Sequence, residues 1–204
     1  MQGFILKVTK IKDEDCIVDV LCADALVRAY RFYGARHPNI TQGYKIDFEL
    51  VSNQNFLPRL SNVMHLGYGW LANREKLIFW QQFIRLLGAH LKDANELDKF
   101  YYELLNSAAS HFGRQNPRRI IIESYAKILE FEGRLHSEPF CFLCDEEISG
   151  AVSLTRGFLP AHEHCLHQKG FNWGEILEFL QSQNSLNLED DAVERLYAIT
   201  LQGF

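Results

Sequence analysis

The sequence predicts an α+β protein of several domains, in which an N-terminal OB-type β-barrel is followed by an α-helical domain with an inserted segment rich in cysteine and histidine. Three observations carry this prediction. Apolar residues alternate with polar ones in short runs before residue 70, they recur at intervals of three and four after residue 74, and cysteine and histidine gather between residues 141 and 167. The predicted parts are the barrel (1–70), the helical domain (71–135), the Cys/His segment (136–170) and C-terminal helices that pack on the helical domain (171–204).

Five strand-like runs account for the first part. Each run is short, and polar turns such as residues 13–15 and 34–39 separate them. Five short strands in about 65 residues fit a five-stranded Greek-key barrel of the OB type. The expected strands cover residues 4–9, 16–21, 26–33, 44–51 and 57–66.

Helical spacing of apolar residues begins after residue 74. Pro117 suits the first turn of a third helix, and Gly133 suits its end. Near the C-terminus, Asn187 or the pair Glu189 and Asp190 is the expected cap of the last helix. The expected helices cover residues 74–91, 96–112, 117–131, 173–180 and 190–201.

The composition is that of a folded globular chain. Of the 204 residues, 47% are hydrophobic and 23% are charged, which excludes a disordered protein, a collagen-like repeat and a coiled-coil rod. No run approaches about 18 uncharged apolar residues, so no membrane-spanning helix is expected. Lys7, Lys10 and Lys12 interrupt the N-terminal stretch, so no signal peptide is expected and the predicted location is the cytoplasm.

Charge is distributed unevenly along the chain, whose net charge is −5. Residues 1–70 carry eight Lys/Arg against seven Asp/Glu, and residues 71–135 carry ten against eight. Residues 136–204 carry three against eleven. The regional charges are therefore +1, +2 and −8, so any contact with a polyanion is expected in the first two thirds.

The five cysteines form two groups. An odd number is a poor basis for a disulfide framework, which agrees with a reducing compartment. Cys16 and Cys22 lie in an apolar run and are expected to be small buried hydrophobic residues. The other three belong to a pattern typical of metal binding.

Cys141 and Cys144 form a Cys-x2-Cys knuckle, and His162 and Cys165 repeat its spacing seventeen residues further on. Two ligands separated by two residues can point at one ion, and a structural zinc ion takes four thiolate or imidazole ligands in a tetrahedron. The sequence therefore predicts a zinc-knuckle segment that holds one structural Zn2+ through Cys141, Cys144, His162 and Cys165.

Alternatives remain open at this site. His164 and His167 compete with His162 as the fourth ligand, although the first adjoins Cys165 and the second lies outside the knuckle spacing. The cysteines also have a reading without metal, as free buried thiols. A redox Cys-x2-Cys is disfavoured because no βαβ pattern surrounds it. A catalytic zinc with Glu163 as acid or base is a weak interpretation, because such a zinc needs an open coordination position and Glu163 is a lone carboxylate between two histidines.

The order and spacing of these parts resemble those of the RecO family of recombination mediators. Residues 3–7, GFILK, resemble the opening strand of the family, and residues 34–38, GARHP, resemble its basic loop. Residues 129–135, LEFEGRL, resemble the segment that precedes its cysteine pairs, the second of which His162 and Cys165 represent here. The chain is shorter than typical members, and its basic loop holds fewer cations.

The resemblance implies a protein of DNA repair and recombination that catalyses no covalent reaction. It implies binding of single- and double-stranded DNA and annealing of complementary strands. It also implies cooperation with RecR, contact with single-stranded-DNA-binding protein and help in loading RecA. A nucleoid-associated location in the cytoplasm follows from these roles, and none of them involves a membrane.

DNA binding requires cations along a groove and aromatic rings that can stack on bases. In the strand region, Arg31 and Arg36 are the favoured cations, and Tyr30, Phe32 and Tyr33 are the nearby aromatics, although a solvated surface and a barrel core are the ordinary explanations. Arg118 and Arg119 lie at a helix start, where positive charge opposes the helix dipole and a phosphate would offset it. The predicted DNA-binding residues are Lys7, Lys10, Arg28, Arg31, Arg36, His37, Arg114, Arg118 and Arg119, and Lys12, Lys45 and Arg59 are further candidates.

Two functions of different classes fit the sequence. The first is a DNA-binding mediator that anneals strands, and the alternative is a zinc-stabilised protein-interaction adaptor without direct DNA contact. The chain has no GxxxxGK[ST] loop and no recognisable nuclease carboxylate cluster, so a metalloenzyme is the third choice.

Overall fold

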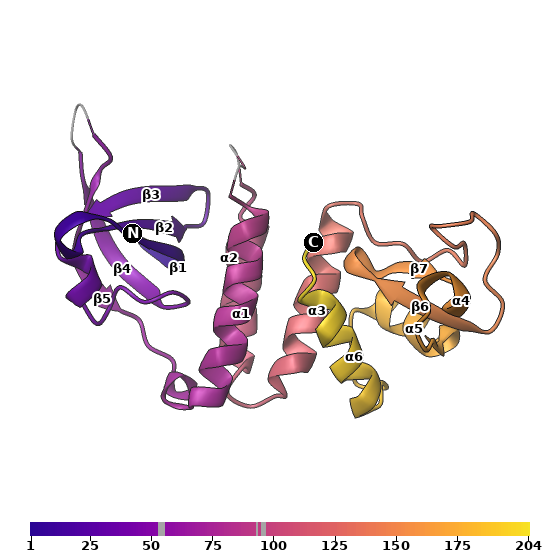
Figure 1. Cartoon of the computed structure of the whole chain (residues 1–204). Helices are drawn as coiled ribbons and strands as arrows, with labels where there is room; N and C mark the ends of the chain where they lie inside the picture. The colour runs from indigo at the N-terminus through magenta and orange to yellow at the C-terminus, as the bar shows by residue number, and fades with distance from the viewer. Residues whose placement is uncertain (53–55, 93, 95–96) are drawn as a thin grey trace. The chain divides into compact units, whose positions relative to one another are not determined.

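The computed structural model describes residues 1–52, 56–92, 94 and 97–204, and these form two compact units (Figure 1). The first unit, residues 1–114, contains the N-terminal strands and two helices, and the second unit, residues 115–204, contains the remaining helices and a small sheet. The four-part domain limits expected from the sequence stay a prediction.

The first unit contains a closed five-stranded barrel, which confirms the predicted fold class. The strand order is β1-β2-β3-β5-β4, and β1 closes the barrel by pairing with β4. All neighbours are antiparallel except β3 and β5, which meet in parallel at Tyr30 and Arg59. The strands are β1 Gln2–Lys10, β2 Cys16–Leu21, β3 Leu26–Arg31, β4 Lys45–Val51 and β5 Arg59–His65.

Alternating side chains fill the barrel interior. Ile5, Val18, Ala29 and Phe48 are almost fully buried in one apolar cluster. Cys16 and Cys22 belong to the same cluster, as their apolar sequence context predicts. Successive side chains of a strand point to opposite faces, so every second side chain points out of the barrel, toward solvent or toward the helices that pack on it.

Two helices pack on the outer face of β1: α1 Arg74–His90 and α2 Phe100–His111. The Phe4 ring lies 6.1 Å from the Trp80 ring and 5.9 Å from that of Tyr102, measured between centroids. Trp80 Nε1 donates a 2.7 Å hydrogen bond to the Gly43 carbonyl. Gly43 has φ +89°, and a Cβ there would lie 2.8 Å from Trp80 Cδ1, so glycine is required at this approach.

Two expected boundaries in this unit are wrong. The third strand ends at Arg31 rather than residue 33, because Tyr33 is left-handed at φ 50° and a 3-10 turn, Gly34–Arg36, follows. The second helix starts at Phe100 and not at residue 96, since Asp98 Oδ1 accepts the Phe100 amide at 2.8 Å. Residues 95 and 96 themselves lie outside the described residues.

The second unit is built on α3 Pro117–Phe131 and α6 Asp190–Thr200, which pack together. The Asn116 side chain caps α3, Pro117 occupies its first turn, and Gly133 follows its end at φ +67°, as the sequence predicts. The last helix is preceded by Glu189, whose side chain makes no capping hydrogen bond. The other elements are α4 Glu163–Leu166, α5 Trp173–Ser182 and a three-stranded sheet in the order β7-β6-β8.

That sheet, β6 Ala151–Thr155, β7 Leu159–Ala161 and β8 Phe171–Asn172, is absent from the sequence-based prediction. Its strands have two to five residues, which is too short for alternation to be recognised. Among the described residues of both units, no helix is long and apolar enough to cross a membrane.

We predict that Trp80→Ala lowers the free energy of unfolding by about 3–5 kcal/mol, because it empties the contact between β1 and α1. Trp80→Phe keeps most of the apolar contact but leaves the Gly43 carbonyl without its donor, so a loss of about 1–3 kcal/mol is expected. Urea unfolding of the full chain followed by circular dichroism measures both. A loss below about 1 kcal/mol for Trp80→Ala would contradict this role.

Candidate metal centre and nucleic-acid interface

Four side chains of the second unit converge on one point. The sulfurs of Cys141, Cys144 and Cys165 and one ring nitrogen of His162 all lie within 4.8 Å of one another. Cys144 Sγ is 3.4 Å and Cys165 Sγ 3.9 Å from His162 Nδ1. A tetrahedral metal with bonds of about 2.3 Å to sulfur and about 2.0 Å to nitrogen places such atoms about 3.5 Å apart. The donor set and its spacing therefore fit one metal ion.

The orientation of the His162 ring supports Nδ1 as the ligand atom. Its other nitrogen, Nε2, lies 3.2 Å from the Glu147 carbonyl oxygen. A carbonyl only accepts hydrogen bonds, so Nε2 carries the proton and Nδ1 presents its lone pair to the thiols. A second hydrogen bond of this kind is the usual support of a metal-binding histidine.

Two tight turns bring the four ligands together. In the first, the Cys141 amide donates to Glu146 O and the Asp145 amide donates back to Cys141 O, at 2.9 and 2.8 Å. In the second, His162 precedes the short helix α4 and its carbonyl accepts the Cys165 amide at 3.1 Å. These turns give both pairs the knuckle geometry that their x2 spacing predicts.

The thiols differ in acidity. Burial raises the pKa of the Cys141 thiol, but hydrogen bonds from the backbone amides of His162, Leu143 and Cys144 outweigh it and lower the pKa to about 6. Burial, together with Cys141 and Cys144, raises the pKa of Cys165 to about 11. Cys141 is thus prepared as a thiolate, and a bound cation would displace the remaining thiol protons.

The competing histidines lie outside the group of four. His164 stacks on the His162 ring, with centroids 4.9 Å apart, and His167 ends α4 in the left-handed conformation at φ 53°. Glu163 Oε1 accepts the Gly170 amide at 2.6 Å, so this carboxylate is engaged in holding the local fold. The structure brings together the four residues that the sequence favoured.

In the first unit, several predicted DNA-binding residues surround a polar pocket of about 450 Å³. Its walls include Arg31, His37 and Arg59. Arg31 Nη1 donates to the Leu60 carbonyl at 2.9 Å, which fixes the guanidinium against β5. The His37 pKa is lowered by burial and, to a smaller extent, by the positive charge of Arg31, so its ring is neutral at pH 7.5.

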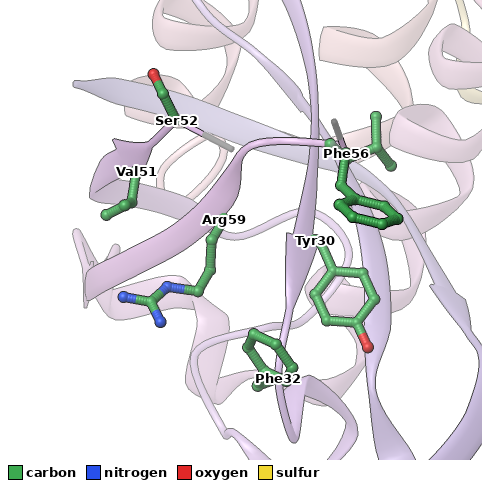
Figure 2. A pocket seen from close by; sticks show the side chains of 7 residues that line it. Tyr30, Phe32, Val51, Ser52, Phe56 and Arg59 are labelled. Atoms are coloured by element: carbon green, nitrogen blue, oxygen red, sulfur yellow. The ribbon is translucent and has the colours of Figure 1, made fainter. Parts of the chain in front are cut away.

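A larger apolar pocket of about 710 Å³ adjoins the polar one, and the two share Phe32 and Arg59 (Figure 2). Figure 2 shows the rings of Tyr30, Phe32 and Phe56 gathered along one side, with the Arg59 guanidinium set apart from them. Phe32 is 53% and Phe56 77% exposed. We call this hollow the aromatic pocket; it is lined by Tyr30, Phe32, Val51, Ser52, Phe56, Leu57 and Arg59.

Asp15 holds the aromatic pocket in shape. Its carboxylate accepts the Tyr30 hydroxyl and, at 2.7 Å, the Tyr33 amide. The hydrogen bond to Asp15 raises the pKa of Tyr30 to about 12, so this phenol stays neutral. The Tyr30 ring lies edge-on to Phe32, with centroids 4.8 Å apart. Arg59 and Phe56 come from the segment after β4. Their approach to Tyr30 could not be predicted from the sequence, because only barrel closure brings β5 beside β3.

The other predicted cations have separate surroundings. Arg36 forms an ion pair with Glu14, Arg28 pairs with Asp19, and Lys7 and Lys10 are exposed on β1. Arg114 is exposed at the end of the first unit. In the second unit, Arg118 lies 6.0 Å from the centroid of the Tyr197 ring.

Arg119 is largely engaged within its own unit. It donates to the carbonyls of Ser185 and Leu188 and to the carboxylate of Asp190, the last two at 2.8 and 2.9 Å. Asp190 therefore supplies, within the protein, a negative charge of the kind that a phosphate was expected to supply. DNA contact by Arg114, Arg118 and Arg119 stays a prediction.

A closed barrel in the order β1-β2-β3-β5-β4, with helices after it, belongs to the OB class, whose members bind oligonucleotides and oligosaccharides. Residues 1–71 match the family model described as RecO N terminal. The N-terminal domain of the chain is therefore of the RecO type, which supports a role in DNA repair and recombination. No curated protein matches the chain.

We predict that His162→Ala removes the metal from the purified full chain and lowers its Tm, because a three-ligand site loses both affinity and the cross-link between two turns. His164→Ala is the matched control, since it removes the neighbouring ring outside the group of four. Elemental analysis of both variants measures the metal content. Equal metal content in the two proteins would contradict the assignment of His162.

Proposed function

We propose that the chain is a DNA-binding recombination mediator that anneals complementary strands and, together with RecR, helps to load RecA on single-stranded DNA coated with single-stranded-DNA-binding protein. The observation that carries this proposal is the pair of adjoining pockets on the RecO-type barrel, one cationic and one aromatic. The protein acts in the cytoplasm, in association with the nucleoid.

The two pockets suit the two chemical parts of an unpaired nucleotide. Exposed rings of Phe32 and Phe56 offer faces for base stacking, which contributes about 1–3 kcal/mol per base. Arg31 and Arg59 at the adjoining polar pocket suit the phosphate. Stacking requires bases that are not paired, so the aromatic pocket favours single-stranded DNA.

The metal centre has a structural role in this proposal, and the ion is zinc. Three thiolates and one imidazole are the donors that structural zinc sites use, and four protein ligands complete a tetrahedron. The ion ties the turn at residues 141–146 to the start of α4. Because four protein ligands fill that site, it has no open position for an activated water and no catalytic role. In this proposal annealing needs no turnover of a nucleotide, since the protein acts by screening the repulsion between two polyanions.

A second candidate function, the zinc-stabilised protein-interaction adaptor, has one observation in its favour. Phe140, Phe142 and Leu143 are 51%, 40% and 52% exposed around the first knuckle. Exposed apolar side chains of this kind suit a protein partner. An adaptor without DNA contact would not bind an oligonucleotide, whatever the salt concentration. A mediator would bind it, with an affinity that falls steeply as salt rises.

We predict that Arg31→Ala combined with Arg59→Ala weakens binding of an oligo-dT strand and flattens the plot of log K against log salt by about 1.4, which is about 0.7 for each phosphate contact on a single strand. Arg74→Ala with Arg156→Ala is the control of equal charge. Fluorescence anisotropy at four salt concentrations measures the slopes. Equal slopes for the two double variants would contradict phosphate binding at the polar pocket.

Binding is also expected to depend on His37. A bound phosphate favours the protonated ring, whose pKa is lowered in the free protein, so affinity should rise as pH falls from 7.5 to 6.0, by roughly two- to five-fold. His37→Gln should lose this component. Because the lowered pKa also makes the fold less stable as pH falls below about 6.5, circular dichroism must accompany the titration. Superimposable pH profiles of the two proteins would contradict the assignment.

A further inference from the structure

A third hollow of about 530 Å³ lies where the barrel meets α1. Among the described residues, its lining includes four cations, Lys7, Arg28, Arg85 and Lys92, and one carboxylate, Asp19. All four cations are exposed, whereas Asp19 is only 8% exposed. We call this hollow the basic groove. Lys7 and Arg28 are among the DNA-binding residues predicted from the sequence, whereas Arg85 and Lys92 are not.

The strand register places the first cations in one row. Lys7 of β1 is opposite Asp19 of β2, which is opposite Arg28 of β3. Arg28 Nε and Nη2 reach the two oxygens of Asp19 at 2.7 and 3.2 Å. This two-point contact orients the guanidinium, and the described lining residues together carry a net charge of +3, from four cations and one carboxylate.

The close approach of α1 adds the other two cations. A Cβ at Gly88 would lie 3.3 Å from the Leu6 backbone oxygen, so a small residue lets the helix lie against β1 at this point. Arg85 is almost one turn before Gly88, and Lys92 lies just beyond the end of α1. The two side chains therefore face the same groove as Lys7, seven residues apart along the chain.

We propose that the basic groove binds the phosphodiester backbone of DNA, paired or unpaired, and so supplies the second DNA contact that strand annealing requires. This inference rests on the proposed function. The described part of the groove lining has cations and aliphatic side chains but no aromatic ring, so it offers charge without a stacking face. The aromatic pocket requires unpaired bases, whereas the groove recognises phosphate alone and accepts a duplex.

The arrangement of β3 links the two sites. Arg28 faces the groove, and Tyr30, two residues further on the same face of the strand, lines the aromatic pocket. A strand held by its bases and a second strand held by its backbone would thus be bound within the same unit. Holding both on one barrel raises their local concentration and screens their mutual repulsion.

The test compares Arg85→Ala/Lys92→Ala with Arg74→Ala/Lys99→Ala, which removes one arginine and one lysine elsewhere on the first unit. The full chain is titrated with a 20-base-pair duplex and with oligo-dT, and annealing of two complementary oligonucleotides is followed by fluorescence without nucleotide. The groove variant should lose about tenfold or more in duplex affinity and about 1.8 in salt slope, and its annealing rate should fall by a similar factor, with Tm unchanged. A third variant, Phe32→Ala/Phe56→Ala, should bind oligo-dT more weakly, because the stacking faces are lost while the phosphate contacts remain, and should keep duplex binding.

The possible outcomes distinguish failure of the proposed function from failure of the groove assignment. If the unmodified protein binds neither DNA at any salt, the proposed function fails. If it binds and anneals, but the groove variant matches its control on the duplex, the function stands and the groove assignment is overturned. Equal loss of duplex affinity in the aromatic variant and the groove variant would also overturn it, because the two sites would then not divide base from backbone.

Discussion

The fold of the first unit depends on burial of β1 on both faces. Ile5 points into the barrel, and Phe4 and Leu6, on the other face, are buried as completely. The same strand closes the barrel by pairing with β2 and β4, and it forms the surface on which α1 packs. The aromatic pocket needs that closure, because it places β5 beside β3, and the basic groove needs α1 seated on β1.

The second unit depends on a different constraint. Its small sheet has strands of only two to five residues. A metal ion held by residues 141, 144, 162 and 165 would replace a larger core, as in other small metal-stabilised segments. Residues 136–204, which form most of the second unit, carry a net charge of −8. This part of the chain is therefore a poor surface for DNA, and the two units suit different partners.

Much of the architecture could be predicted from the sequence, because strong periodicity and fixed ligand spacing are local signals. All five barrel strands and α3, with its Pro117 start and Gly133 end, follow from such signals, and so does the choice of His162 over its neighbours. The β6–β8 sheet could not be predicted, since its strands are too short to show a period. Neither could the assembly of Arg59 with Tyr30, or of Arg85 with Lys7, because these contacts depend on barrel closure and on helix packing.

The central claim is that the barrel and α1 form the DNA-binding surface. The most direct measurement is a two-dimensional NMR titration of the isotope-labelled full chain with a short oligo-dT strand and, separately, with a duplex. The single strand should shift the signals of Tyr30, Phe32 and Arg59, and the duplex should shift those of Lys7, Arg28 and Arg85. Shifts confined to residues 115–204, or no shifts at low salt, would contradict the account.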